Sequence, residues 1–308
     1  MLRNAKRFIY VTVVGNFMKT LLIIIIVLSG CSGFGQNNDK KLLRNSFKKG
    51  DIETLNMFFS KWEKECQPIS QNQLDILSDT IQDVYEIFTD FYTPQDLNRI
   101  GGTQWGDSIY TDVDYFIVQN RIDFAYTETF DKKELFRKYF TNEYFGTEQM
   151  TQNKKSFLKD TTDFSLGLVL GSLIEYSDKD SIMDFQPNLE FNDIGILYFR
   201  PKYIRTISDF LRNQHHNLGF GGIMNPARAK GKSEKRLNWI NQKIKVFHGH
   251  WGGYWQMTTY PRVTQILFDK KRESAIVFFR MIYEGGEALY KKIDNKWTLI
   301  DAKRTWME

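Results

Sequence analysis

The chain has 308 residues, 42% hydrophobic and 15% aromatic, so it can bury a large core, and extensive disorder is excluded. Its formal charge of +5 is misleading, because residues 1–30 contain four basic side chains and no acidic one. The remainder has 38 basic and 37 acidic side chains. A body this close to neutral lacks the field that attracts phosphate backbones, so we expect no nucleic-acid partner.

The N-terminal residues have the pattern of an export signal. Lys19 precedes an eight-residue apolar run, residues 21–28. Eight helical residues rise about 12 Å, whereas the hydrocarbon layer is about 30 Å thick, so the run fits a signal peptide better than a membrane span. We expect translation to begin at Met18, because residues 1–17 would lengthen the signal unusually. The alternative is one spanning helix over residues 8–30, with Lys19 unfavourably placed at its middle.

A cysteine follows the apolar run in the sequence Leu28-Ser29-Gly30-Cys31. This resembles the lipobox of bacterial lipoproteins. The resemblance implies that residues 1–30 are removed and that Cys31 receives a diacylglyceryl group, with further acylation, such as palmitate, on its amino group. Two or more acyl chains hold a protein stably on a lipid bilayer. Ser32 is not the aspartate that the resemblance associates with inner-membrane retention, which favours the outer membrane of the cell envelope.

Residues 31–39 are small, polar and glycine-rich, as expected of a flexible tether. The other cysteine, Cys66, has no partner within the chain if Cys31 carries lipid. No neighbouring base is evident from the sequence, so we interpret Cys66 as an inert thiol on a helix rather than a nucleophile.

Residues 40–216 are predicted to form a helical and mixed α+β region. Residues 42–67 have the spacing of a helical hairpin, in which Asp51 caps the second helix. Residues 74–91 form a third helix, ended by Pro94. Further expected elements are strands within 108–130 and at 194–199, and helices at 134–145, 164–176 and 203–211. Asp178 and Asp180 are interpreted as loop acids.

Residues 217–308 are predicted to form a separate α+β part, which begins with the glycine-rich basic loop 217–233. Ser233 is expected to cap a helix over residues 234–245. An antiparallel meander follows, with strands at 263–268, 274–283, 287–293 and 297–306. Gly285-Gly286 and Asp294-Asn295 would form its tight turns, since both tolerate positive φ.

A helix followed by a four-stranded meander resembles the later part of NTF2-like, or cystatin-like, α+β cones. The resemblance covers residues 231–306 and concerns the pattern of elements, without a diagnostic motif. It implies a curved sheet around a pocket that is catalytic, ligand-binding or filled by side chains. The fold class expected for the whole chain is therefore α+β.

The densest group of chemically versatile side chains lies at residues 248–255. His248 and His250 would share a face if this segment is extended. With His215, His216 or Glu287 they could begin a zinc or copper site, although His-x-His alone is a weak signal and we predict no metal or cofactor. Trp251, Tyr254 and Trp255 could instead stack on a ligand or pack in the core.

Arg280 is a cation in a strand that is apolar on both faces. A buried guanidinium needs a carboxylate partner, and Glu287 or Asp301 is expected to provide it. Alternatively, Arg280 lines a pocket and binds an anionic ligand. Together these patterns predict an envelope lipoprotein that binds a small ligand or another envelope protein. The alternatives are a metal-dependent or other hydrolase with its site at His248 and His250, and a structural accessory of an envelope complex.

Overall fold

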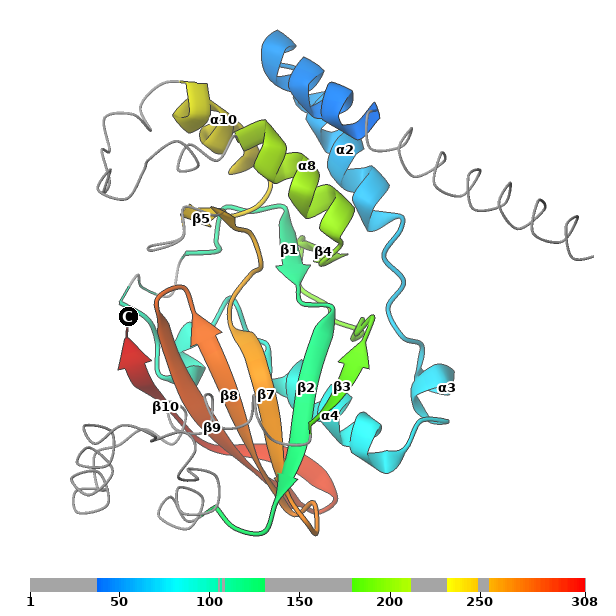
Figure 1. Cartoon of the computed structure of the whole chain (residues 1–308), viewed down its shortest axis with the longest axis vertical. Coiled ribbons are helices and arrows are strands. Elements are labelled where there is room, and N and C mark those ends of the chain that lie inside the picture. The colour runs from blue at the N-terminus through cyan, green and yellow to red at the C-terminus, as the bar shows by residue number, and fades with distance from the viewer. Residues whose placement is uncertain are drawn as a thin grey trace, which may run out of the picture. The chain divides into compact units, whose positions relative to one another are not determined.

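The computed structural model describes residues 38–104, 106, 109–130, 179–211, 232–248 and 255–307. The predicted Cys31 anchor and the helices expected at 134–145 and 164–176 lie outside these residues. The chain divides into two compact units (Figure 1). A helical unit comprises residues 1–60 and 201–212, and a sheet unit comprises residues 61–200 and 213–308. Helices and strands are both abundant, which confirms the α+β class.

The helical unit confirms the predicted hairpin. A helix over residues 38–49 is followed by α2, Ile52–Glu63, whose last three residues belong to the sheet unit. Gly50 joins the two helices with a φ of +63°, and Asp51 caps α2 by accepting a 3.1 Å bond from the amide of Thr54. The unit is completed by α8, Pro201–Leu211, which confirms the helix expected there. The ring of Phe58 packs edge-on against Tyr203.

The sheet unit contains a six-stranded sheet in the order β10-β9-β8-β7-β2-β3. Its neighbouring strands are antiparallel except for β2 and β7, which are parallel. The four strands of the predicted meander are confirmed, and β2 and β3 extend their sheet. The bounds are β2 Arg121–Thr127, β3 Asp180–Met183, β7 Arg262–Asp269, β8 Ser274–Met281, β9 Glu284–Ile293 and β10 Lys296–Met307.

The turns of the meander follow the prediction in one case and correct it in another. Asp294 and Asn295 have φ of +48° and +63° and form the expected tight turn between β9 and β10. Gly285 and Gly286, however, lie inside β9, opposite Arg280 and Phe279 of β8. The chain reverses at residues 282–283 instead, where Ile282 has a φ of +51°.

One face of the sheet is covered by α4, Asp79–Phe91, which crosses it in Figure 1. The helix predicted over residues 74–91 is confirmed as α4, but it begins at Asp79 rather than at residue 74. The short α3, Gln71–Leu74, precedes it, with residues 75–78 between the two. The Ser70 side chain and Gln73 form a capping box that starts α3. A continuous core forms between α4 and the sheet, with Val84, Phe88, Phe91, Ile266, Val277, Phe279 and Tyr290 among its buried members.

Smaller elements complete the sheet unit. β1, Tyr115–Val118, and β4, Gly195–Tyr198, pair in parallel, which confirms strands in both predicted regions. α10, Lys232–Ile240, is shorter than predicted at its C-terminal end, and Ser233 lies inside it rather than capping it. A 3-10 helix, η1, spans Leu97–Ile100. Two short strands, β5 Phe247–His248 and β6 Trp255–Gln256, pair with each other.

Candidate functional site

The structure places part of the predicted aromatic and histidine cluster on a two-stranded ladder. His248 of β5 and Trp255 of β6 are directly opposite each other in the antiparallel register. The segment is therefore extended at His248, as the hypothesis of a shared histidine face required. His250, Trp251 and Tyr254 lie outside the described residues, as do His215 and His216.

Arg280 and Glu287 lie on one face of the sheet but have different described partners. Their shared face follows from the register, because Arg280 is opposite Gly285 while Glu287 is opposite Phe278. Arg280 Nε donates a 3.1 Å bond to the carbonyl of Ile282, at the β8–β9 turn. Glu287 Oε1 instead pairs with Lys303 Nζ at 3.2 Å. Among the described residues, the expected Arg280 ion pair with Glu287 or Asp301 is not formed.

A metal site is not assembled within the described part of the chain, where no group of three or more His, Cys, Asp or Glu side chains is placed to hold an ion. Glu287, one of the three side chains proposed to complete the site, lies in β9 and is ion-paired with Lys303.

One cavity of about 650 Å³ lies beside Cys66. Its lining includes Glu63, Cys66, Leu189, Phe191, Ile196 and Tyr198, and contains neither Arg280 nor Trp255. The thiol of Cys66 accepts a 3.3 Å bond from the amide of Tyr198 and donates a 3.4 Å bond to the carbonyl of Trp62. Burial raises the pKa of the Cys66 thiol, which outweighs the opposing effect of the Tyr198 amide. Because a nucleophilic cysteine needs a lowered pKa, the inert interpretation of Cys66 is favoured.

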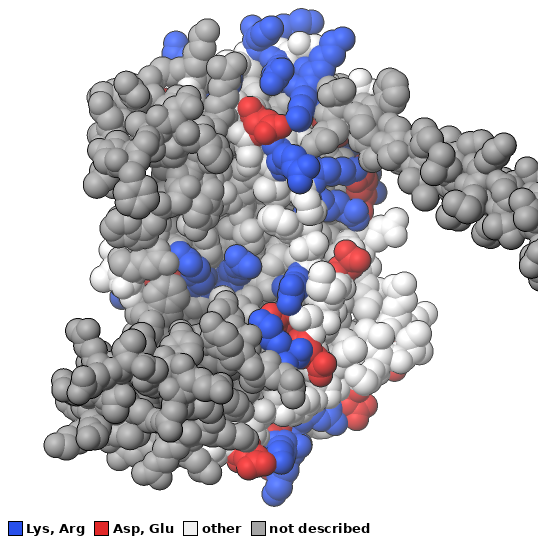
Figure 2. All heavy atoms as spheres, in the orientation of Figure 1, with Lys and Arg blue, Asp and Glu red and all other residues white. Residues whose placement is uncertain are grey.

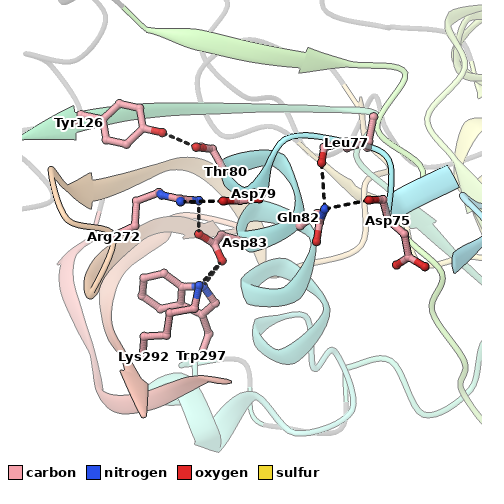
Figure 3. A network of polar contacts seen from close by, with 10 residues as sticks. All are labelled: Asp75, Leu77, Asp79, Thr80, Gln82, Asp83, Tyr126, Arg272, Lys292 and Trp297. Atoms are coloured by element: carbon pink, nitrogen blue, oxygen red, sulfur yellow. Dashed lines mark hydrogen bonds and ion pairs between the residues drawn. The ribbon is translucent and has the colours of Figure 1, made fainter. Parts of the chain in front are cut away.

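A second cavity, of about 510 Å³, lies where α4 begins beside the edge of the sheet. Ser78, Thr80 and Ile81 come from the start of α4, and Phe124 and Tyr126 come from β2. The hydroxyls of Thr80 and Tyr126 are 2.6 Å apart and join the two walls (Figure 3). All four residues of β3 contribute the remaining wall. We call this cavity, with β3, the edge groove.

The edge groove is bordered by exposed apolar side chains. Of the lining residues, Met183 is 63% exposed and Tyr126 is 39% exposed. Ile76, two residues before the lining residue Ser78 in the sequence, is 82% exposed. β3 is the last strand of the sheet and, among the described residues, pairs only with β2. An edge strand presents backbone N–H and C=O groups on its outer side, and a second chain can pair with them.

β3 is fastened to β2 by a cluster of charged side chains. Asp123 of β2 accepts a 2.7 Å hydrogen bond from the hydroxyl of Ser181 in β3, and it also pairs with Arg121 and Lys179. Burial would raise the pKa of Asp123, but these hydrogen bonds outweigh it and hold the pKa below its usual value. The carboxylate therefore remains charged and fastens β3 to β2.

The start of α4, which forms the helical wall of the edge groove, is held by an ion cluster centred on Asp83 (Figure 3). The buried Asp83 carboxylate contacts Arg272 Nη1 at 3.0 Å and Lys292 Nζ at 2.7 Å. Arg272 follows β7 and Lys292 lies near the end of β9, so the cluster fastens α4 to two strand ends. Gln82, one residue earlier, donates a 2.8 Å bond to the carbonyl of Leu77 and orders the entry to the helix.

The edge groove was not predicted from the sequence because the sequence of β3 lacks the pattern of a strand. Asp180 was interpreted as a loop acid, yet it begins β3. A four-residue strand with one half-buried and three exposed residues shows no alternation of apolar and polar residues that could reveal it. The alternation at Ile122, Phe124 and Tyr126 did predict β2, but not which strand would pair with it.

Among the described residues, none of the helices has the length and apolar character needed to cross a membrane. We compared the chain with protein-family models, curated proteins and solved structures, and none of the three comparisons found a match.

Proposed function

We propose that this protein is an envelope lipoprotein, held on a bilayer by acyl chains on Cys31, and that its α+β body binds a partner protein. The observation that carries the anchor is the sequence around Cys31. Lys19, the short apolar run and Leu28-Ser29-Gly30-Cys31 occur in the order and spacing of a lipoprotein signal. Residues 21–28 are too short to span a bilayer, so lipid on Cys31 would supply the attachment.

The edge groove supports the binding role. An extended peptide can add to an exposed sheet edge through main-chain hydrogen bonds, while its alternate side chains enter a neighbouring pocket. β3 offers the edge, and the cavity beside Thr80 and Tyr126 offers the pocket. The exposed side chains of Met183 and Ile76 favour an apolar occupant. The partner we propose is therefore an extended, apolar segment of another envelope protein.

A small ligand held between Arg280 and Trp255 is less well supported than the groove. Neither residue lines the cavity beside Cys66 or the edge groove. The hydrolase hypothesis ranks lower for a related reason, because Lys303 is paired with Glu287, the carboxylate that would complete its site. We therefore assign the body a binding rather than a catalytic role.

The anchor is tested by the intact mass of the protein extracted from membranes. A chain that starts at Cys31 and carries the added mass of diacylglyceryl and further acyl groups would support it. A chain that starts at an unmodified Met1 would refute it. Cys31→Ser should abolish the added mass, whereas Cys66→Ser, which changes the other cysteine, should leave it in place.

The binding role is tested by placing a photoreactive amino acid at Met183 or Ile76 in living cells. Both positions should form a covalent adduct with the same envelope protein. Ile300, which is 46% exposed in β10, is the matched control and should not form that adduct. Identical adducts at all three positions, or none at Met183 and Ile76, would contradict a binding site at β3.

A further inference from the structure

The near-neutral charge of the body conceals a strongly uneven distribution within the helical unit. Lys41, Arg44 and Lys48 are all exposed on the helix over residues 38–49. Their spacing of three and four residues places them in one stripe along the helix. The buried residues Asp39 and Leu43 lie on the opposite side, facing the core. The helix is therefore amphipathic with an outer face of cations.

A second, shorter stripe lies on α8. Lys202 and Arg205 are exposed and three residues apart. The next residue along this stripe is Asp209, which pairs with Lys40 Nζ at 2.6 Å. That ion pair neutralises the acid and fastens α8 to the helix over residues 38–49. We call Lys41, Arg44, Lys48, Lys202 and Arg205 the basic face.

Few negative charges oppose the basic face within the helical unit. Its described residues include seven basic and four acidic side chains. Of the acids, Asp39 is buried, Asp209 is paired with Lys40, and Asp51 caps α2. Figure 2 shows Lys and Arg side chains gathered over the first helix of this unit. A concentration of cations that exceeds local acids attracts an anionic surface.

The chain outside the described residues limits how far this unit can lie from the proposed anchor. Six residues lie between Cys31 and Asn38, the first described residue, so seven residue steps separate the two. Fully extended, they span at most about 25 Å. A random-coil chain of seven residue steps has an average span of about 15 Å. The screening length of physiological salt is about 8 Å, so the basic face can readily come within electrostatic range of the bilayer surface.

We propose that the basic face binds the anionic phospholipid headgroups of the membrane in which Cys31 is anchored. This inference rests on the proposed lipoprotein function and adds a second membrane contact to it. Lysine and arginine side chains close to an anionic bilayer each contribute measurably to binding. The acyl chains supply attachment, and the basic face holds the first helix and α8 against the headgroups.

The test uses the lipidated full chain in vesicles of phosphatidylcholine, alone or mixed with phosphatidylglycerol. Acetylation rates of individual lysines are followed by mass spectrometry. Lys41 and Lys48 should be protected several-fold in the anionic vesicles only, and about 1 M salt should remove the protection. Lys271, Lys291 and Lys296 are exposed in the sheet unit and serve as internal controls. Equal rates for Lys41 and Lys48 in both vesicles would overturn the proposal.

A charge variant measures the size of the effect. The mature chain with Cys31→Ser, which cannot carry lipid on this residue, is tested for binding to the same anionic vesicles. Lys41→Gln with Arg44→Gln and Lys48→Gln should weaken binding on the order of 100-fold. The matched control, Lys271→Gln with Lys291→Gln and Lys296→Gln, removes the same charge and should weaken it far less. Equal losses in both triple variants would show non-specific attraction and would overturn the basic face.

The two proposals fail separately in these experiments. A purified chain without lipid on Cys31 would refute the anchor, whatever its lysines do. A lipidated chain whose Lys41 and Lys48 react equally in neutral and anionic vesicles would leave the anchor intact and refute the basic face.

Discussion

The carboxylate of Asp83 accepts a 2.8 Å hydrogen bond from the indole Nε1 of Trp297 and thereby joins α4 to β10. The same carboxylate pairs with Lys292 and Arg272, and its side chain is only 5% exposed. Lys292 also lies over the Trp297 ring, 5.4 Å from its centroid. Two cations and an indole donor offset the hydration that this carboxylate loses on burial.

Asp83→Asn should therefore destabilise the protein by about 2–4 kcal/mol, because it leaves two partly buried cations without their shared counter-charge. Asp79→Asn is the matched control. Asp79 pairs with Arg272 at 3.2 Å, but its side chain is 82% exposed, so its loss should cost less than about 1 kcal/mol. Urea unfolding monitored by tryptophan fluorescence measures the free energy of unfolding of both variants. Similar losses for the two variants would contradict the central role of Asp83.

Gly286, in β9, lies too close to its neighbours to accommodate a side chain. A Cβ added there would lie 2.3 Å from the Lys303 carbonyl oxygen and 2.5 Å from the Phe279 ring. Gly286→Ala should lower the free energy of unfolding by more than about 2 kcal/mol, because β10 must move to relieve a backbone contact. Gly50→Ala, at a φ of +63° with open space around it, should cost about 1 kcal/mol. Thermal unfolding of both variants provides the comparison, and a smaller loss at Gly286 would be inconsistent with close strand packing.

The two predicted turns of the meander show why one was located correctly from the sequence and the other was not. Asp294 and Asn295 were predicted correctly because their backbone preference and the turn they form are both local. Gly286 carries the same local signal, but its small size is needed for packing against Phe279. The turn is made by Ile282 instead, a β-branched residue at positive φ that no propensity rule would select.

Long-range pairing explains the rest of what the sequence could not predict. Helical periodicity located α4 approximately, yet nothing local indicates that it packs on strands about two hundred residues later. The parallel pairing of β2 with β7 and the edge position of β3 are likewise set by tertiary contacts. For the candidate site, register placed Arg280 and Glu287 on one face as expected, but it could not reveal that Lys303 would pair with Glu287.

Buried tyrosines should make the protein sensitive to alkali. Tyr92, Tyr110, Tyr198 and Tyr290 are each at most 2% exposed, and burial raises their pKa above the ordinary value near 10. For Tyr290, whose hydroxyl donates a 2.7 Å hydrogen bond to the carboxylate of Asp90, the negative charge of Asp90 acts in the same direction.

The sign of the alkaline effect follows from these raised values. The unfolded chain loses its tyrosine protons near pH 10 and the folded chain only at higher pH, so stability should be complete below pH 10 and fall above it. Exposed tyrosines should ionise near pH 10, whereas the tyrosinate absorbance of the four buried residues should appear only together with loss of circular dichroism. Tyr290→Phe should make the decline above pH 10 shallower. Full ionisation of the tyrosines while the dichroism is unchanged would contradict their burial.

The thiol of Cys66 offers a local test of the cavity beside it. Burial raises its pKa above the ordinary value near 9, so at pH 8 the folded protein should hold less thiolate than a free cysteine does. Its alkylation rate should keep rising with pH through pH 9, where the rate for a free thiol begins to level off. Unfolding in urea should restore ordinary behaviour, because the burial that raises the pKa of Cys66 is then lost. Rapid, pH-independent alkylation of the folded chain near neutrality would instead indicate an activated thiol and reopen a catalytic role for this cavity.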